Sequence, residues 1–261
     1  MTHSRSFILA AAFLLLPLAA PRLMAQYHSS WSAAPPSGVL SPTPSQWWIG
    51  PQIGANLVTH SGDFVTDFCQ CSFADGSGAG ISVGLELGHM LSPWFGLALK
   101  AVYSGMGADY SYFIMRNAVL ETGETVLARH ERTNRVELGY LSFNPVLQLH
   151  PFNGLYFFAG PAVGFNTAGT TEYTLKIADD RYLFDIGGPE ERPIEEDNGD
   201  IPGLESLRLD LRFGLGANIR LGRSFLFSPE VSYNLPMTTI SSDDNWKAEA
   251  FHLIGVFKFE L

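Results

Sequence analysis

The sequence predicts an all-β fold, one eight-stranded antiparallel up-and-down transmembrane β-barrel. Three observations indicate this fold. Eight segments alternate apolar and non-apolar residues, their connections are alternately short and long, and the chain ends on such a segment. That last segment, FHLIGVFKFEL at 251–261, is apolar at every second position except Gly255. In water an unpaired apolar strand promotes aggregation, so the segment is expected to face a different solvent.

Residues 1–25 have the features of a secretory signal peptide. Arg5 precedes the mostly apolar run 7–20, and the small residue Ala25 precedes Gln26, where we expect cleavage. The alternative is a membrane anchor, but a helical span needs about 20 apolar residues and this run is shorter. Residues 26–45 follow. They are rich in Pro, Ser and Ala without periodicity, which predicts a flexible segment before a barrel at 46–261.

The eight predicted strands each carry one apolar face and are bounded by turn residues. They span 47–58, 80–90, 94–104, 136–149, 155–165, 207–221, 225–235 and 251–261. The apolar faces include Trp47, Ile49, Ile53 and Leu57 in the first segment, Ile81, Val83, Leu85 and Leu87 in the second, Phe95, Leu97, Leu99 and Tyr103 in the third, Leu141, Phe143, Leu147 and Leu149 in the fourth, and Leu207, Leu209, Leu211, Phe213, Leu215, Ile219 and Leu221 in the sixth. Tight turns at 150–154 and 222–224 introduce the fifth and seventh segments.

The connections alternate in length. Those after the second, fourth and sixth segments have about three to five residues, and the others have roughly 20, 30, 40 and 14. Short turns at one end and long loops at the other are typical of an outer-membrane barrel. Structureless loops of this length disfavour a compact soluble domain. Residues 109–135 are expected to extend their strands as a hairpin.

The non-apolar face indicates which side meets lipid. It consists mainly of Gly and small residues, whereas the exterior of a lipocalin-like barrel in water would be crowded with Lys and Glu. Its charged residues include Glu86, Lys100, Arg208, Asp210, Arg212, Glu230, Lys258 and Glu260. We predict that Arg208, Asp210 and Arg212 pair with Glu86, Glu230 or Lys100 and plug the interior, because eight strands leave room only for side chains. Glu260 and Arg220 are expected at a rim.

Aromatic residues lie near the strand ends, where membrane barrels carry an interfacial girdle. They are Trp47, Trp48, Trp94, Phe95, Phe152, Tyr156, Phe225 and Phe227. The alternative for such residues is the core of a soluble sandwich.

The stretch YLSFNPVLQLH at 140–150, followed by GLYFFAGPAVGF at 154–165, resembles the central hairpin of the outer-membrane β-barrel domain family, the PorT-like barrels of Bacteroidetes and relatives. The AGPxxG part at 159–164 matches best. Ser142 and Asn144 stand where that family often has Glu and Pro, with Pro145 displaced by one. The resemblance implies an eight-stranded outer-membrane barrel and little about activity.

The two cysteines, Cys69 and Cys71, are separated by one residue. In an oxidising exported setting they suit a local disulfide. Free or intermolecularly paired thiols remain open, as does a metal site with the neighbouring His60 and Asp63 or Asp67.

An enzyme needs a reactive constellation, and no nucleophile elbow, HExxH or phosphate loop is present. A Ser/His/carboxylate set could still assemble from separate strands, because triads are defined by geometry. Its candidates are His89, His130, His150, His252, Ser82, Ser104, Ser232 and Glu230. We expect no enzymatic activity and no cofactor.

The segment 178–205 is strongly acidic, and EEDNGD at 195–200 could bind a divalent cation through oxygen ligands, although it lacks calcium-loop spacing. With Arg5 and Arg22 removed, 14 Lys and Arg face 26 Asp and Glu, a net charge of −12. Nucleic acid is therefore excluded as a partner, since phosphate binding requires a basic surface.

Together these features predict a monomeric integral protein of the outer membrane, exported through its signal peptide. Its partner is the lipid bilayer, and the loops could contact cation-bridged lipopolysaccharide or a protein. The expected role is structural or partner-binding. The alternatives are an outer-membrane barrel enzyme and a secreted lipocalin-like carrier.

Overall fold

The computed structural model of the chain describes residues 46–66, 71–119, 124–152, 154–177 and 193–261. The predicted signal peptide, its cleavage point between Ala25 and Gln26, and the segment 26–45 lie outside these residues. So do Cys69, the side chain of Cys71, and 178–192 of the acidic segment. The predictions made for them therefore stay predictions.

The described residues are mostly in β-strands. The strands are β1 (Trp47–Thr66), β2 (Cys71–Met90), β3 (Phe95–Gly105), β4 (Ala108–Val119), β5 (Thr125–Phe152), β6 (Leu155–Ile177), β7 (Pro193–Asp200), β8 (Leu207–Ala217), β9 (Ile219–Arg220), β10 (Phe225–Pro236) and β11 (Lys247–Glu260). No helix in this part of the chain is long and apolar enough to cross a membrane.

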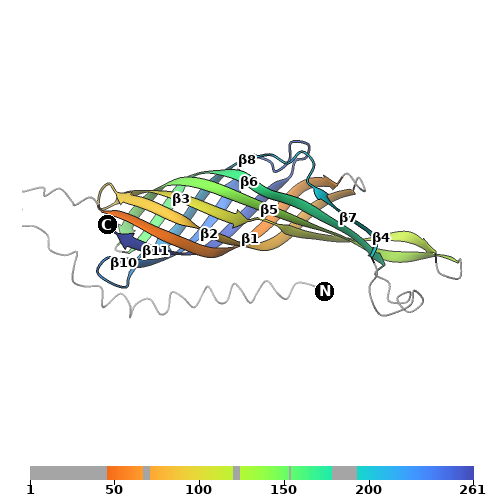
Figure 1. Ribbon diagram of the computed structural model, residues 1–261, viewed down its shortest axis with the longest axis horizontal. Helices are drawn as coiled ribbons and strands as arrows, with labels where there is room; N and C mark the ends of the chain where they lie inside the picture. The colour runs from red at the N-terminus through yellow and green to blue at the C-terminus, as the bar shows by residue number, and fades with distance from the viewer. Residues whose placement is uncertain (1–45, 67–70, 120–123, 153, 178–192) are drawn as a thin grey trace, which may run out of the picture. The chain divides into compact units, whose positions relative to one another are not determined.

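Eight of these strands close a ring in which every neighbouring pair is antiparallel (Figure 1). The order is β1, β2, β3, β5, β6, β8, β10, β11 and back to β1. The ring closes where Trp48 lies opposite Glu260 and Ile53 opposite Gly255. The predicted eight-stranded up-and-down barrel is confirmed. The C-terminal strand has no free edge, because it pairs on both sides.

Several strands are longer than the sequence predicted. β1 continues to Thr66 and β2 begins at Cys71, and the two remain paired over residues expected to be loop. The predicted hairpin at 109–135 is confirmed, since β4 pairs with β5 from Ala108↔Val136 to Val119↔Thr125. It projects at the end of the barrel opposite the C-terminus (Figure 1).

β7 is a correction to the expected acidic loop. The pairing of β6 with β8 ends at Phe165↔Leu207, which leaves the edge of β6 beyond it without a partner. β7 pairs with that edge from Thr170↔Asp200 to Lys176↔Pro193. Buried or edge backbone groups need hydrogen-bond partners, and this requirement outweighs the low strand propensity of EEDNGD.

The end of the barrel that holds the C-terminus has an apolar exterior and a polar interior. We call this part the belt: residues 47–58, 80–90, 95–104, 140–152, 155–165, 207–221, 225–236 and 250–260. Large apolar side chains such as Ile53, Leu85 and Phe213 are about half exposed on its outside. The polar Gln52 and the charged Glu86, Lys100, Arg208, Asp210, Arg212, Glu230 and Lys258 are buried within it.

The described residues 59–66, 71–79, 105–119, 124–139, 166–177, 193–206 and 238–249 form what we call the distal extension, and its polarity is reversed. Its interior is an apolar core that includes Phe73, Met106, Tyr110, Val136, Leu138, Tyr173, Leu175, Ile201, Ile240 and Trp246. Its exterior carries polar side chains such as Thr59, Asp75, Ser77, Asp109, Ser111, Arg135 and Glu137. Only the belt therefore has the arrangement expected of strands in lipid.

The predicted aromatic girdle is correct in part. Trp47, Trp94 and Phe152 face outward near the C-terminal end of the barrel. Trp48 and Tyr156 instead face the interior and are 6% and 0% exposed. The period of two explains Trp48, because two adjacent residues of one strand cannot share a face.

Candidate functional site

Lys100 on β3 is the centre of the charged interior. Its Nζ lies 2.7 Å from Oε2 of Glu86 and 2.6 Å from Oε2 of Glu230. Glu86 lies directly opposite Lys100 on the neighbouring strand, whereas Glu230 on β10 reaches it from across the interior. All three side chains are fully buried. The contact therefore links opposite walls of the barrel through charge-assisted hydrogen bonds.

Lys258 on β11 supplies a second ammonium group to this cluster and lies close to Glu86. Its Nζ lies 3.3 Å from Oε1 of Glu86 and donates to the Tyr156 hydroxyl over 3.1 Å. Tyr156 in turn donates to Oε1 of Glu230 over 2.7 Å, and Trp48 Nε1 donates to Glu86 over 2.8 Å. Two ammonium groups thus meet two carboxylates in a closed network, as a buried charge requires.

The sequence placed Lys258 on the polar face but not in this network. It also missed Trp48 and Tyr156, which it assigned to the lipid interface. The sequence did contain a signal for these positions: residues separated by an even number of positions along a strand lie on the same face. Trp48 shares its parity with Gln52, and Lys258 and His252 also share one face of β11.

Arg208, Asp210 and Arg212 occupy one face of β8 inside the barrel. Nε of Arg208 donates to Oδ1 of Asp210 over 2.8 Å, and its Nη2 donates to the Ala248 carbonyl. Nη2 of Arg212 donates to Oγ of Ser232 over 3.0 Å.

The expected partners of Arg208 and Asp210 were therefore wrong. These residues pair with each other rather than with Glu86, Glu230 or Lys100. Side chains two apart on a strand point the same way, and an arginine is long enough to reach along it. Arg220 and Glu260 were expected at a rim and form a partly exposed pair there, with Nη1 of Arg220 2.9 Å from the carboxylate.

A second hydrogen-bond network lies inside the distal extension. His60 contacts the Tyr110 hydroxyl through Nδ1 at 2.7 Å and the Met106 carbonyl through Nε2 at 2.9 Å. Trp246 Nε1 donates to the same hydroxyl over 2.9 Å. Burial lowers the pKa of His60 to about 4, so its neutral form is favoured. The proton then resides on Nε2, while Nδ1 accepts from Tyr110.

The candidate catalytic residues do not form an accessible site. Oγ of Ser82 lies 3.3 Å from Nδ1 of His252, but both residues are 1% exposed and lie inside the belt. The other contacts of Ser82 are Asn56 and Ser104, and Glu230 is held by Lys100. His89 stacks on Trp47 and His150 on Tyr156. His130 contacts the Ala128 carbonyl.

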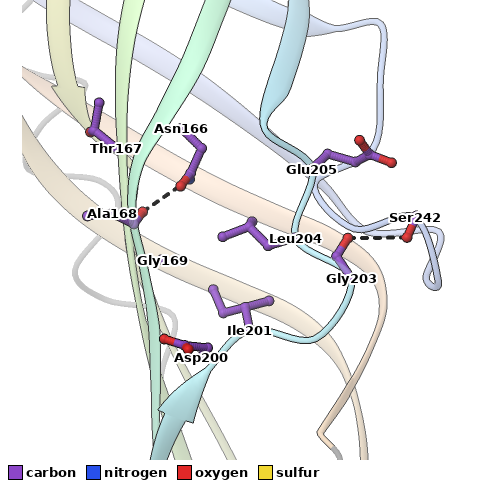
Figure 2. A pocket seen from close by; sticks show the side chains of 10 residues that line it. All are labelled: Asn166, Thr167, Ala168, Gly169, Asp200, Ile201, Gly203, Leu204, Glu205 and Ser242. Carbon is purple, nitrogen blue, oxygen red and sulfur yellow. Dashed lines mark hydrogen bonds between the residues drawn. The ribbon is translucent and has the colours of Figure 1, made fainter.

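A groove opens in the outer wall of the distal extension where β6 changes partner from β8 to β7 (Figure 2). It has a volume of about 650 Å³ and is lined by residues of 166–169 and 200–205 together with Ser242. Ile201 and Leu204 supply apolar surface, and Asp200 and Glu205 supply exposed carboxylates (Figure 2). The hydroxyl of Ser242 lies 3.3 Å from the Gly203 carbonyl and 3.1 Å from Oδ1 of Asp243.

The described residues contain no group of three or more His, Cys, Asp or Glu side chains placed to hold a metal ion. The candidate cation segment EEDNGD lies in β7, where Asp197 and Asp200 are exposed. The side chains of Glu195 and Glu196 lie outside the described residues. Cation binding by this segment stays a prediction.

No protein-family model matches the sequence, and no curated protein matches it. Similar solved structures include Ail, the attachment invasion locus protein of Yersinia pestis, with 10% identity over 82% of this chain and 99% of that chain and a TM-score of 0.33. Neisserial surface protein A has 11% identity over 82% and 97%, with a TM-score of 0.37. The outer membrane protease OmpT from Escherichia coli has 9% identity over 85% and 99%, with a TM-score of 0.32. Likeness at this level says nothing about what this chain binds or does.

Proposed function

We propose that the protein is an integral outer-membrane β-barrel with a closed interior, which holds the distal extension outside the cell for a structural or partner-binding role. The belt is the observation that carries the proposal. Among the described residues 38 large apolar side chains are exposed, of which 31 lie on the belt and four, Leu91, Trp94, Met237 and Leu261, lie at its rims. In water they would form a patch on the order of 2,000 Å² or more, several times the largest patch of an ordinary soluble protein.

The interior supports a closed barrel. The side chains of Lys100, Glu86 and Glu230 meet across it with no exposed surface, and Arg212 and Gln148 are equally buried. An eight-stranded barrel leaves space only for such side chains, so we infer a plug in place of a channel. The same feature disfavours a lipocalin-like carrier, which would need an apolar lumen for its ligand.

An enzymatic role has weaker support. The Ser82–His252 contact is its best observation, and it lies inside the wall where a lipid or peptide substrate has no access. We propose that the barrel is not an enzyme.

The proposal has three further parts, which concern the protein family, export and contact with lipopolysaccharide. The hairpin motif at 140–165 supports a relation to PorT-like barrels. Residues 1–25 support export with cleavage before Gln26. The groove of Figure 2 lies directly beyond Phe165 and Leu207, at the edge of the belt, where Asp200 and Glu205 could contact lipopolysaccharide through bridging cations.

Membrane fractionation with heat-modifiable gel mobility tests the proposal. We expect the protein in the outer-membrane fraction, with a folded form that resists SDS until it is boiled. A periplasmic protein without such a form would contradict membrane insertion. After reconstitution in planar bilayers we expect no stable conductance, and a steady channel current would contradict the closed interior.

A further inference from the structure

Three large exposed apolar residues remain among the described residues after the belt and its rims are set aside. They are Phe113, Met115 and Leu127, with exposed fractions of 49%, 58% and 57%. All three lie on the β4–β5 hairpin, and the alternation places them on its outward face. Elsewhere on the described distal extension the outward side chains are polar or small. These three residues therefore form an apolar patch in an otherwise water-facing surface.

Two charged residues complete this face. In the β4–β5 register Phe113 lies opposite Glu131, Met115 opposite Arg129, and Asn117 opposite Leu127. The Arg129 guanidinium carbon lies 3.7 Å from the centre of the Phe113 ring, so the cation is held over the ring by a cation–π contact. We call Phe113, Met115, Leu127, Arg129 and Glu131 the hairpin patch.

Lipid cannot cover the hairpin patch. Arg129 lies twelve residues along β5 from Leu141, the nearest lipid-facing leucine of that strand. At about 3.3 Å per residue and a tilt of about 40°, this places the patch roughly 30 Å beyond the belt. That distance exceeds the thickness of a headgroup layer, which is about 5–8 Å. A protein surface is therefore the appropriate cover.

The direction of the patch restricts how a partner approaches. Leu127 and Arg129 have the same parity along β5 as the lipid-facing Leu141 and Phe143, and all four are exposed. The patch thus continues the lipid-facing side of the wall, and a partner meets it by moving in the plane of the membrane. A second copy of the chain carries the same patch at the same height.

The charges of the patch fit a second copy. When two copies face each other across a two-fold axis along the membrane normal, β4 of one lies opposite β5 of the other. Phe113 then lies opposite Glu131 of the second copy, and the Arg129 guanidinium already lies over Phe113. Two reciprocal Arg129–Glu131 pairs can form around an apolar centre. A chain with a formal charge of −10 gains from contact through a neutral, self-complementary surface.

We propose that the hairpin patch is the contact through which two copies of this protein associate side by side in the membrane, in place of the monomer expected from the sequence. Two facing hairpins bury only a few hundred Å² each, which is below the roughly 1,200–2,000 Å² total of a stable soluble interface. Association then depends on confinement and common orientation in the membrane. It is expected in membranes and not in dilute detergent. The proposal rests on the proposed membrane insertion.

Cross-linking in membranes tests the association. In a Cys69→Ser, Cys71→Ser background, Asn117→Cys introduces a thiol beside the patch and Ser242→Cys introduces a control thiol in the exposed β10–β11 connection. With a short bis-maleimide we expect a dimer band from Asn117→Cys and none from Ser242→Cys. Equal bands from both would indicate random collision and overturn the proposal. Products at masses other than the dimer would assign the patch to a different protein and overturn it as well.

A charge exchange tests the geometry. We expect Arg129→Glu and Glu131→Arg each to reduce the dimer band at least threefold, because each places like charges face to face. The double exchange, or co-expression of the two single variants, should restore it. Failure of that restoration would contradict the reciprocal pairing. Every variant is checked for heat-modifiable mobility, so a folded and inserted protein that does not cross-link overturns this inference and leaves the proposed function intact.

Discussion

The belt and the distal extension are built from the same strands but place their apolar residues on opposite faces. Along β5, Leu141 and Phe143 face outward in the belt while Asn144 faces inward. A few residues earlier, Arg135 and Glu137 face outward and Val136 and Leu138 inward. The alternation continues unchanged, and only the chemistry of the two faces is exchanged. The comparison shows that the surrounding solvent, and not the strand, decides which face must be apolar.

The two regions are also stabilised differently. The interior of the belt holds charged groups whose burial is costly unless every one is paired. The interior of the extension is mainly an apolar core like that of a soluble protein, with a few buried polar side chains: His60, His130, Asn134 and Ser241. Substitutions that separate these two mechanisms sharpen the comparison.

The largest effect is expected from Lys100→Ala. It leaves Glu86 and Glu230 buried without their shared cation, and breaking a buried pair costs about 3–5 kcal/mol. Urea unfolding of the refolded barrel in detergent micelles measures this loss. The matched control is Arg135→Ala, because Arg135 and Asp109 form a pair on the extension that is more than half exposed. The control should have no measurable effect, and equal losses in the two variants would contradict the role given to the interior.

Trp246→Ala is expected to cost about 3–5 kcal/mol, the usual cost of removing a large buried aromatic side chain. The loss should be confined to the extension, because Trp246 packs in the apolar core there. Hydrogen exchange should show faster exchange in 59–66 and 108–119 with unchanged protection in the belt. Simultaneous loss of protection in both regions would show that they unfold as one unit.

The same charged substitution should have different effects on the two outer faces. Leu215→Arg places a charge on the lipid side of the belt, where the cost is about 2–4 kcal/mol. Ser77→Arg places it on the water side of the extension, where we expect a change within about 0.5 kcal/mol. Unfolding in lipid vesicles measures both. Equal tolerance of the two arginines would place the belt in water.

The last effect is a pH dependence that belongs to the extension and appears only below about pH 6.5. The pKa of His60 is lowered by burial to about 4 in the folded protein, against an ordinary value near 6.5, so the unfolded chain binds the proton more tightly. The stability is present in full above pH 6.5 and is lost as the pH falls towards 4, by about 3 kcal/mol. His60→Gln should remove this part of the pH dependence. A pH profile that is the same in both proteins would contradict it.

Much of the fold followed from period-two alternation. It located eight strands and the apolar face of each, because the two faces of a strand are dictated by sequence parity. It did not locate the ends of β1, β2 and β6. Beyond the belt the outward residues become polar and the inward ones apolar. Because we expected every strand to have an apolar exterior, we ended the predicted strands where this change occurs.

The contacts between side chains in the barrel interior were harder to predict from the sequence than the strands. Parity placed Lys100 and Glu230 on inward faces, but their meeting across the barrel depends on the stagger of strands far apart in the sequence. The Arg208–Asp210 pair could have been anticipated from their spacing. The hairpin patch could not, because Tyr112, Phe113, Ile114 and Met115 are all apolar or aromatic and the sequence alone does not show which of them the core covers.

The most direct test of the membrane-facing belt is the solvent accessibility of spin labels in bilayers. In the Cys69→Ser, Cys71→Ser background, labels at Leu211→Cys and Ser111→Cys report the outward faces of the belt and of the extension. We expect the label at 211 to be accessible to oxygen and shielded from a polar nickel complex, and the label at 111 to show the reverse. A label at 211 that collides freely with the nickel complex would contradict a lipid-facing belt.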